Sequence, residues 1–151
     1  MEMAKQLSVS LINKPGHLAD MLSRLNKEKV EFHALSVMDS GERGKVRFVP
    51  ADAKAAAEVL RKADISFEKA DVLLVEASNQ PGGFRKICER LASEHLNIDY
   101  AYCSFDTGGR VKGNVMAVIR VNNLAKAQRV LSENGNVSRR KLPQRRPVHA
   151  R

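Results

Sequence analysis

Apolar and polar residues alternate near the start of the chain, and the spacing then changes. In QLSVSLI, the apolar residues Leu7, Val9 and Leu11 alternate with polar ones, as on a half-buried β-strand. The phrase NKPGHL follows at residues 13–18. Beyond it, apolar residues recur at the i, i+3, i+4, i+7 spacing of an amphipathic helix: Leu18, Met21, Leu22 and Leu25. The sequence therefore predicts a strand, a short loop and a helix.

The same patterns return 66 positions later. NQPGGF at residues 79–84 repeats the asparagine, the Pro-Gly pair and the bulky apolar residue of NKPGHL. The strand-like segment VLLVEA precedes it. The helical apolar stripe after it consists of Phe84, Ile87, Cys88 and Leu91. The chain is therefore predicted to contain two copies of one unit.

Each copy continues with the same predicted elements. Second strands are expected in VEFHALSVM and LNIDYAYCSF, followed by the turns DSGERGK and DTGGRVKGN and by the third strands VRFVP and VMAVIRV. Second helices are expected over residues 53–62 and 123–133, the latter ending at NGN around Gly135. This order predicts the α+β class, with two ferredoxin-like βαββαβ units, each an antiparallel sheet with its helices on one face.

The fourth strands differ between the copies and set the expected boundaries. ISFEK supplies a fourth strand to the first copy, whereas the second would find its own in NVSRRKL, which has only two apolar residues. We expect one unit over residues 1–70 and a second over 71–135, joined by the short connection EKADV. Residues 136–151 carry six basic residues and no acidic one, and they are expected to form a disordered tail.

Composition and motifs exclude several functions. No apolar run approaches the ~20 residues of a membrane span, and MEMAKQ lacks the layout of a secretory signal, so a cytoplasmic protein is expected. Cys88 and Cys103 form no C-x-x-C pair and are expected to be reduced structural thiols, Cys88 in the core; no metal site and no cofactor are predicted. Neither G-x-S-x-G nor H-E-x-x-H occurs, and GERGK is too short for a phosphate-binding loop, so we expect no catalysis.

The repeated loop phrase carries the chemistry. Proline fits the first turn of a helix, glycine allows close approach of a ligand, and the exposed N–H groups there attract a carboxylate or a phosphate. Asn13 and Asn79 could bind a ligand, or they could cap their own helices. The local chemistry leaves both interpretations open.

The order of strand, N-x-P-G-x-[L/F] phrase, helix and then VEFHALSV or LNIDYAYC resembles the ACT domain, a small-molecule regulatory module of amino-acid metabolism. The resemblance covers residues 5 to about 133 in two copies, without a catalytic domain. It implies a ferredoxin-like fold that pairs with another ACT unit. It also implies that an amino acid binds where the loop after the first strand meets the neighbouring unit.

Carried onto this sequence, the resemblance implies two sets of ligand-binding residues: Asn13, Gly16, His17 and Leu18, and Asn79, Gly82, Gly83 and Phe84. The asparagine would hold a polar group of the ligand, and the glycines would present N–H groups to its carboxylate. The ends of the second strands could form the opposite wall: Met38, Asp39, Cys103 and Ser104. Because His17 stands where the second copy has Gly83, the two sites need not be equivalent, and His17 could equally face water.

Other residues are expected to be structural. His33 and His95 are placed on solvated faces, and the period-two pair Tyr100 and Tyr102 is expected to pack against a neighbouring unit. In the second strand of the first copy, alternation predicts apolar residues on both faces, with Phe32, Ala34 and Met38 on one face and Leu35 and Val37 on the other. The uncovered face favours a homodimer, although the sibling copy could cover it instead.

The sequence leaves two alternative functions open. RNA-recognition modules share the βαββαβ order, and RGKVRFV resembles one of their signatures, but the chain has few aromatic residues for base stacking. The beginning of the chain also resembles the regulatory subunit of a branched-chain amino-acid biosynthetic enzyme. The predicted partners are an amino acid, a second copy of the chain and a regulated enzyme, and nucleic acid is expected only in non-specific contacts of the basic tail.

Overall fold

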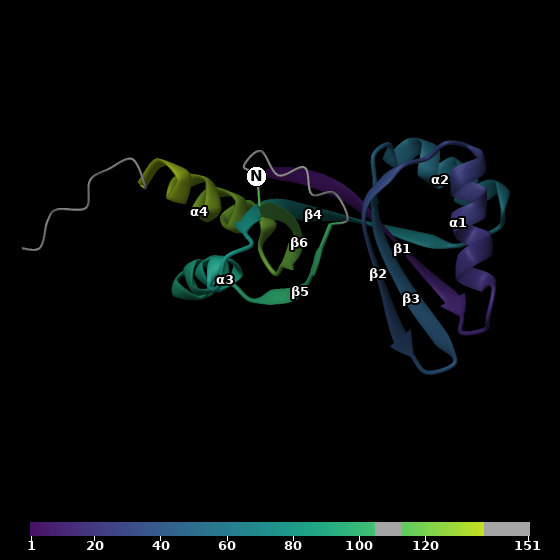
Figure 1. The fold of residues 1–151 in the computed structure, drawn as a ribbon, viewed down its shortest axis with the longest axis horizontal. Helices are drawn as coiled ribbons and strands as arrows, with labels where there is room; N and C mark the ends of the chain where they lie inside the picture. The colour runs from purple at the N-terminus through teal and green to yellow at the C-terminus, as the bar shows by residue number, and fades with distance from the viewer. Residues whose placement is uncertain (105–112, 138–151) are drawn as a thin grey trace, which may run out of the picture.

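The fold is described from a computed structural model, in which residues 1–104 and 113–137 are described, with side chains up to residue 132 (Figure 1). The elements in chain order are β1 (Glu2–Ile12), α1 (His17–Lys27), β2 (Phe32–Ser40), β3 (Arg43–Pro50), α2 (Ala53–Lys62), β4 (Phe67–Ser78), α3 (Gly83–Ser93), β5 (Ile98–Cys103), β6 (Asn114–Val121) and α4 (Leu124–Val137).

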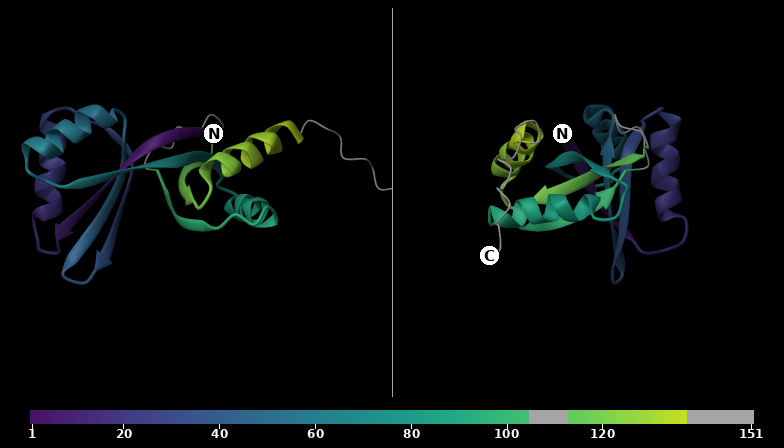
Figure 2. Two further views of the ribbon diagram at one scale, coloured as in Figure 1. Left: turned by 180° about the vertical axis from the view of Figure 1, so that it is seen from behind. Right: turned by 60° about the vertical axis from the view of Figure 1, so that its left-hand side comes forward.

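All strands belong to one antiparallel sheet in the order β2-β3-β1-β4-β6-β5. Helices α1 and α2 lie with the first half of the sheet and α3 and α4 with the second, and β1 and β4 run between the two halves (Figures 1 and 2). The predicted element order and the antiparallel α+β fold with two ferredoxin-like units are confirmed.

The prediction of a connection between the units at EKADV is wrong, because those residues lie inside β4. The first residues of β4 pair with β1, where Phe67 lies opposite Val9, and its last residues pair with β6, where Ser78 lies opposite Asn114. One strand therefore serves as the fourth strand of the first unit and the first strand of the second. The expected boundary between residues 70 and 71 falls inside this strand.

The fourth-strand position of the second unit is filled by the beginning of the chain. In β1, Glu2 and Ala4 lie opposite Leu74 and Val72 of β4, on the edge that a fourth strand would occupy. Part of NVSRRKL, Asn136 and Val137, belongs instead to α4, and the rest of it lies outside the described residues, as does most of the expected tail. The edge of β4 that a fourth strand would pair with is thus occupied by β1.

Helix α4 also passes through the expected stop at NGN. A single glycine in a helix costs only about 1 kcal/mol relative to alanine and does not by itself end the helix. The second helix of the first unit, α2, has the predicted bounds. Its N-cap residue Asp52 accepts hydrogen bonds from the N–H groups of Lys54 and Ala55.

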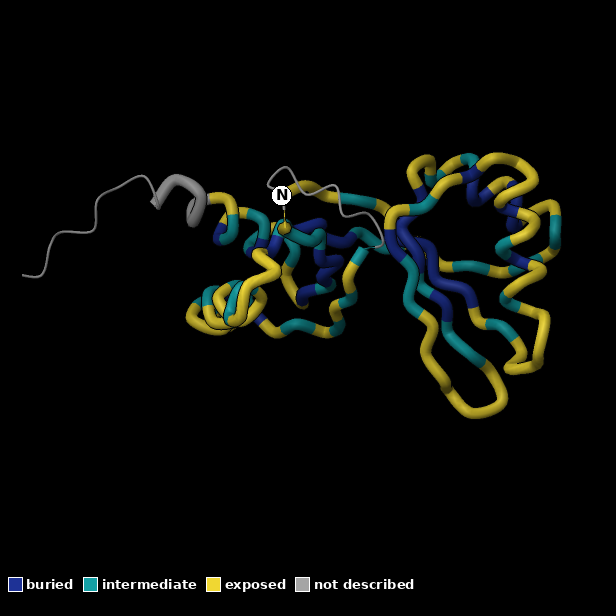
Figure 3. Tube along the Cα trace, in the orientation of Figure 1, coloured by how far each residue is buried: buried dark blue, intermediate teal, exposed yellow. Residues whose placement is uncertain are grey.

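Each unit has its own core between sheet and helices (Figure 3). In the first unit the predicted stripe of α1 packs on the sheet, with Met21 and Leu25 buried. In the second, Leu91 is buried and Ile87 packs beside it, but Phe84 is 41% exposed and Cys88 is only half-buried. The predicted stripe of α3 is therefore wrong at Phe84, which lies beyond the core, and Cys88 is not a fully buried core residue.

A third core cluster joins the two units through their helix-free faces. Its buried members are Ala34, Val49, Val72, Leu74 and Val118. The sheet curls until its two edges meet, and an isolated antiparallel bridge links Ala34 of β2 to Ser104. The uncovered face of the sheet was the reason to expect a homodimer. Much of that face is covered by the sibling unit of the same chain.

A bulge in β2 changes the predicted faces of this strand. The register between β2 and β3 shifts between Phe32 and Ala34. As a result, Phe32 packs on the first core together with Leu35, whereas Ala34 belongs to the third cluster. The prediction that Phe32 and Ala34 share a face is wrong, because an extra residue in one strand reverses the alternation beyond it.

A polar network lies at the centre of the joined faces. Gln6 has no exposed surface; its Nε2 donates to the Tyr100 hydroxyl and its Oε1 accepts from the Tyr102 hydroxyl, both at 2.6 Å. The Arg47 guanidinium lies 3.9 Å from the centre of the Tyr100 ring. The two tyrosines therefore pack against the neighbouring unit, as predicted, and Gln6 is buried although its strand pattern predicts a solvated face.

Candidate functional site

The second unit contains a pocket of about 300 Å³ at the N-terminal end of α3. Five of the residues expected at the site line it: Asn79, Gly82, Gly83, Phe84 and Cys103. The remaining lining residues are Ala77, Ser78, Gln80, Arg85, Val115 and Ala117. The pocket thus lies between the repeated loop, the first turn of α3 and the ends of three strands, and its volume suits a small molecule.

Gly83 sets how closely α3 approaches the sheet. A Cβ at this position would lie 2.1 Å from the Ser78 carbonyl oxygen, far inside van der Waals contact. Gly82, just before it, has φ of 83°, a conformation that glycine adopts without strain. Gly82 and Gly83 are therefore both required by the backbone of this loop, and they bring the helix end to the pocket.

The first turn of α3 offers hydrogen-bond donors to the pocket. The Gly83 N–H bonds to the Gln80 carbonyl at 3.0 Å and the Lys86 N–H to the Gly82 carbonyl at 3.1 Å. Since the first N–H groups of a helix have no acceptor within it, those of Phe84 and Arg85 remain for a ligand. Together with the helix dipole they favour a carboxylate.

Arg85 adds a positive charge that the sequence patterns did not single out. Its side chain is 71% exposed and its Nη1 lies 3.6 Å from the Glu89 carboxylate. A cation in the first turn of a helix is disfavoured by the helix dipole, and a bound anion would relieve this. That unfavourable position, one residue after the repeated phrase, is the sequence signal that could have identified Arg85.

The asparagines do not cap their helices. The N-cap residues of α1 and α3 are Gly16 and Gly82, and neither helix has a side-chain cap. Instead, Asn13 Nδ2 lies 3.4 Å from both Asp39 Oδ1 and the Gly41 carbonyl oxygen. The capping alternative is therefore excluded for both, and Asn13 is engaged with the β2–β3 turn.

The first unit arranges the corresponding residues differently. The Asn13 N–H bonds to the Glu42 carbonyl at 2.8 Å, which fixes the loop to the β2–β3 turn. Leu18 packs on the first core, His17 is exposed, and a Cβ on Gly16 would meet nothing within 4 Å. Asp39 is thus brought next to Asn13, whereas His17 faces solvent and Leu18 faces the core.

The other predicted residues fall outside the pocket. Met38 is 46% exposed near the end of β2, and the Ser104 N–H bonds to the Met116 carbonyl at 2.8 Å. His33 and His95 are exposed, as predicted, and both cysteines are free thiols. Within residues 1–104 and 113–132, whose side chains are described, there is no cluster of metal-ligating side chains. In the same residues no helix is long and apolar enough to cross a membrane.

Comparisons with known proteins agree with this fold. A family model described as an ACT domain pair matches residues 2–139. Protein BT0572 from Bacteroides thetaiotaomicron is 29% identical, with 88% of this chain and 89% of that chain covered and a TM-score of 0.80. The regulatory subunits of aspartate kinase from Thermus thermophilus and Thermus flavus share the fold at 16% and 17% identity, with TM-scores of 0.61 and 0.63. The two alignments cover 88% and 91% of this chain, and 93% and 94% of the respective subunit chains. A search of curated proteins gives no significant match.

Proposed function

Because this chain belongs to the ACT domain pair family, we propose that it is a non-catalytic cytoplasmic sensor that binds a free amino acid and regulates an enzyme of amino-acid metabolism. The observation that carries the proposal is the pocket at α3, where five of the residues expected from the resemblance meet. The ligand carboxylate would accept hydrogen bonds from the first turn of α3 and face Arg85. Asn79 would bind a second polar group of the ligand.

The geometry of the sheet argues against the RNA-binding alternative. An RNA-recognition sheet stacks bases on exposed aromatic residues. Here Phe48 is buried in the first core, and Tyr100 and Tyr102 bond to Gln6 between the units. The helix-free faces meet in the third core cluster, so the surface that would hold RNA is covered. The alternative of a branched-chain enzyme subunit is disfavoured because the ACT pair extends over the second half of the chain.

A screen of the twenty amino acids by thermal unfolding tests the proposal. An amino acid present at 100 times its dissociation constant should add about 2.7 kcal/mol to the free energy of unfolding. For a chain of this size each kcal/mol raises the melting temperature by about 2–4 °C. We expect one amino acid, or a few of one chemical type, to give such a shift, and the absence of any shift would reject the proposal.

Variants locate the site. Asn79→Ala and Arg85→Ala should each weaken binding about tenfold or more, since each removes a charged or polar contact worth about 1.5–3 kcal/mol. Lys86→Ala is the matched control, because Lys86 is the next residue of α3, is exposed and does not line the pocket. Equal loss in the control would show that general charge, and not the pocket, governs binding.

We also propose a homodimer formed through β2. This strand is an edge of the sheet, and beyond the bridge at Ala34 its side chains Val37 and Met38 are 53% and 46% exposed. An exposed apolar edge favours pairing with another strand. Light scattering should give twice the chain mass of 16.8 kDa, and Val37→Asp should give the monomer. Glu31→Lys, an exposed change just before β2, should leave the dimer intact, and a monomeric wild-type protein at micromolar concentration would disprove the dimer.

A further inference from the structure

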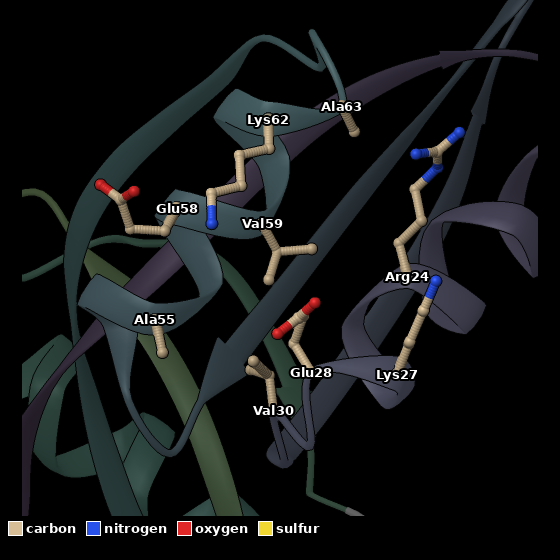
Figure 4. Close-up of a pocket in the computed structure, with 9 residues that line it drawn as sticks. All are labelled: Arg24, Lys27, Glu28, Val30, Ala55, Glu58, Val59, Lys62 and Ala63. Atoms are coloured by element: carbon tan, nitrogen blue, oxygen red, sulfur yellow. The ribbon is translucent and has the colours of Figure 1, made fainter.

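The two units differ in a groove between their helices, away from the repeated loops. In the first unit a pocket of about 360 Å³ lies between α2 and the end of α1 (Figure 4). Its apolar lining residues are Val30, Ala55, Val59 and Ala63. Its charged lining residues are Arg24, Lys27, Glu28, Glu58 and Lys62. None of them belongs to the proposed amino-acid site at α3.

The ends of the first helices show which residues correspond. Lys29 and His95 follow the helices with the same φ of 56°. One residue further on, the Val30 N–H donates to the Leu25 carbonyl at 2.9 Å, and the Leu96 N–H donates to the Leu91 carbonyl at 3.0 Å. Glu28 of the first unit therefore corresponds to Glu94 of the second.

The starts of the second helices show the same correspondence. Asp52 accepts from the Ala55 N–H and Asn123 from the Lys126 N–H, both at 3.1 Å. Four residues after each acceptor stands a fully buried alanine, Ala56 or Ala127. Ala55 of the first unit therefore occupies the position that Lys126 occupies in the second.

In the second unit the groove holds the lysine. The Lys126 ammonium donates to the Glu94 carbonyl oxygen at 2.9 Å, at the negative end of the α3 dipole. In the first unit, Ala55 is too short to do this. Among the described residues, no side chain donates to the Glu28 carbonyl oxygen. The open pocket of the first unit thus lies at the position where the second unit holds an aliphatic ammonium.

The charges on the rim suggest what the rest of the ligand carries. Arg24 is paired with Asp20 at 3.0 Å and Glu58 with Arg61 at 3.2 Å. No ion pair is found in the described part of the chain for the other three charged lining residues, Glu28, Lys27 and Lys62. One carboxylate and two ammonium groups therefore remain for a ligand, and Figure 4 shows them on both sides of the groove.

We propose that this pocket binds a short aliphatic ω-amino acid. Its ammonium would take the place of the Lys126 ammonium and bond to the carbonyl and carboxylate of Glu28. Its methylene groups would lie on Val30 and Val59, and its carboxylate would face Lys27 and Lys62. This site is independent of the proposed function, because it shares no residue with the pocket at α3.

Titration with 5-aminopentanoate, followed by amide NMR of the 151-residue chain, tests the proposal. We expect saturable shifts at Val30, Ala55 and Val59, with binding at least tenfold weaker for pentylamine and for pentanoate, which each lack one charged end. The absence of saturable shifts in this groove would overturn the proposal.

Substitutions based on the second unit test the same pocket. Ala55→Lys should rebuild the contact of Lys126 and abolish binding, whereas Ala53→Lys adds the same charge outside the pocket and should preserve it. Lys126→Ala should open the second groove and produce new shifts around Leu96. Retained binding in Ala55→Lys would also overturn the proposal, and the amino-acid response at α3 should be unchanged in all three variants.

Discussion

Replacing Gly83 with alanine is expected to lower the free energy of unfolding by about 3 kcal/mol, the upper range for overpacking a close contact. The new Cβ would lie 2.1 Å from the Ser78 carbonyl oxygen and 3.0 Å from the Ser78 Cβ, and the nearest of these is backbone that cannot rotate away. Helix α3 would have to move from the strand end. Denaturant unfolding of both proteins measures the change.

Gly16→Ala is the matched control for this prediction. Gly16 stands in the corresponding loop of the first unit, at the position of Gly82, with φ of 92°, but nothing lies within 4 Å of a Cβ built there. It should therefore cost only the conformational strain of a non-glycine residue, about 1–2 kcal/mol. Equal losses in the two variants would show that the close approach at Ser78 does not limit the fold.

The same substitution bears on function. If α3 moves, its first N–H groups and Arg85 move with it, and the pocket loses its arrangement. Gly83→Ala should therefore lose the amino-acid response under conditions where it is still folded. A folded variant that keeps the full response would indicate that the ligand binds elsewhere.

Local patterns predicted most of the elements because each depends on neighbours in the chain. The apolar stripe of α1 and the bounds of α2 follow from residues within a few turns. The repeated phrase likewise predicted the loop that lines the pocket at α3. Asn79, Gly82, Gly83 and Phe84 meet there because one loop and one helix end carry all four.

Pairing between distant segments could not be predicted in this way. The beginning of β1 occupies the edge of β4 that a fourth strand would use, and this depends on strand lengths in both units. The burial of Gln6 depends on the curling of the whole sheet, since only then do the helix-free faces meet. The bulge at Phe32 reversed a face because alternation holds only within an unbroken register.

Replacing Gln6 with leucine is expected to lower the free energy of unfolding by about 2–4 kcal/mol. Gln6 is fully buried and binds the hydroxyls of Tyr100 and Tyr102, which come from the other unit. Leucine would leave both hydroxyls without this partner, and a buried polar group left unpaired costs about 1–3 kcal/mol. Ser8→Ala, on the same face with only a 3.4 Å contact to Gln6, should cost less than 1 kcal/mol.

A triple variant separates the hydrogen bonds from the packing. If the cost of Gln6→Leu comes from unpaired hydroxyls, then adding Tyr100→Phe and Tyr102→Phe should recover much of the lost stability, since removing both partners of a buried bond is nearly neutral. A triple variant less stable than the single one would show that the side-chain volumes, and not the bonds, hold the units together.

The network should also make stability depend on pH in the alkaline range. Burial raises the pKa of Tyr102 above its ordinary value of 10, and the neighbouring Tyr100 raises it further, while Arg47 partly opposes them. The folded protein then binds the hydroxyl proton more tightly than the unfolded chain. The contribution of Tyr102 to the free energy of unfolding is therefore complete below pH 10 and is lost as the pH rises above it. Above pH 10 the free energy of unfolding should fall with a slope that approaches about 1.4 kcal/mol per pH unit. Tyr102→Phe should lose this slope in denaturant unfolding between pH 9 and 11, whereas an unchanged slope would show that other groups govern alkaline unfolding and that Tyr102 is not held neutral between the units.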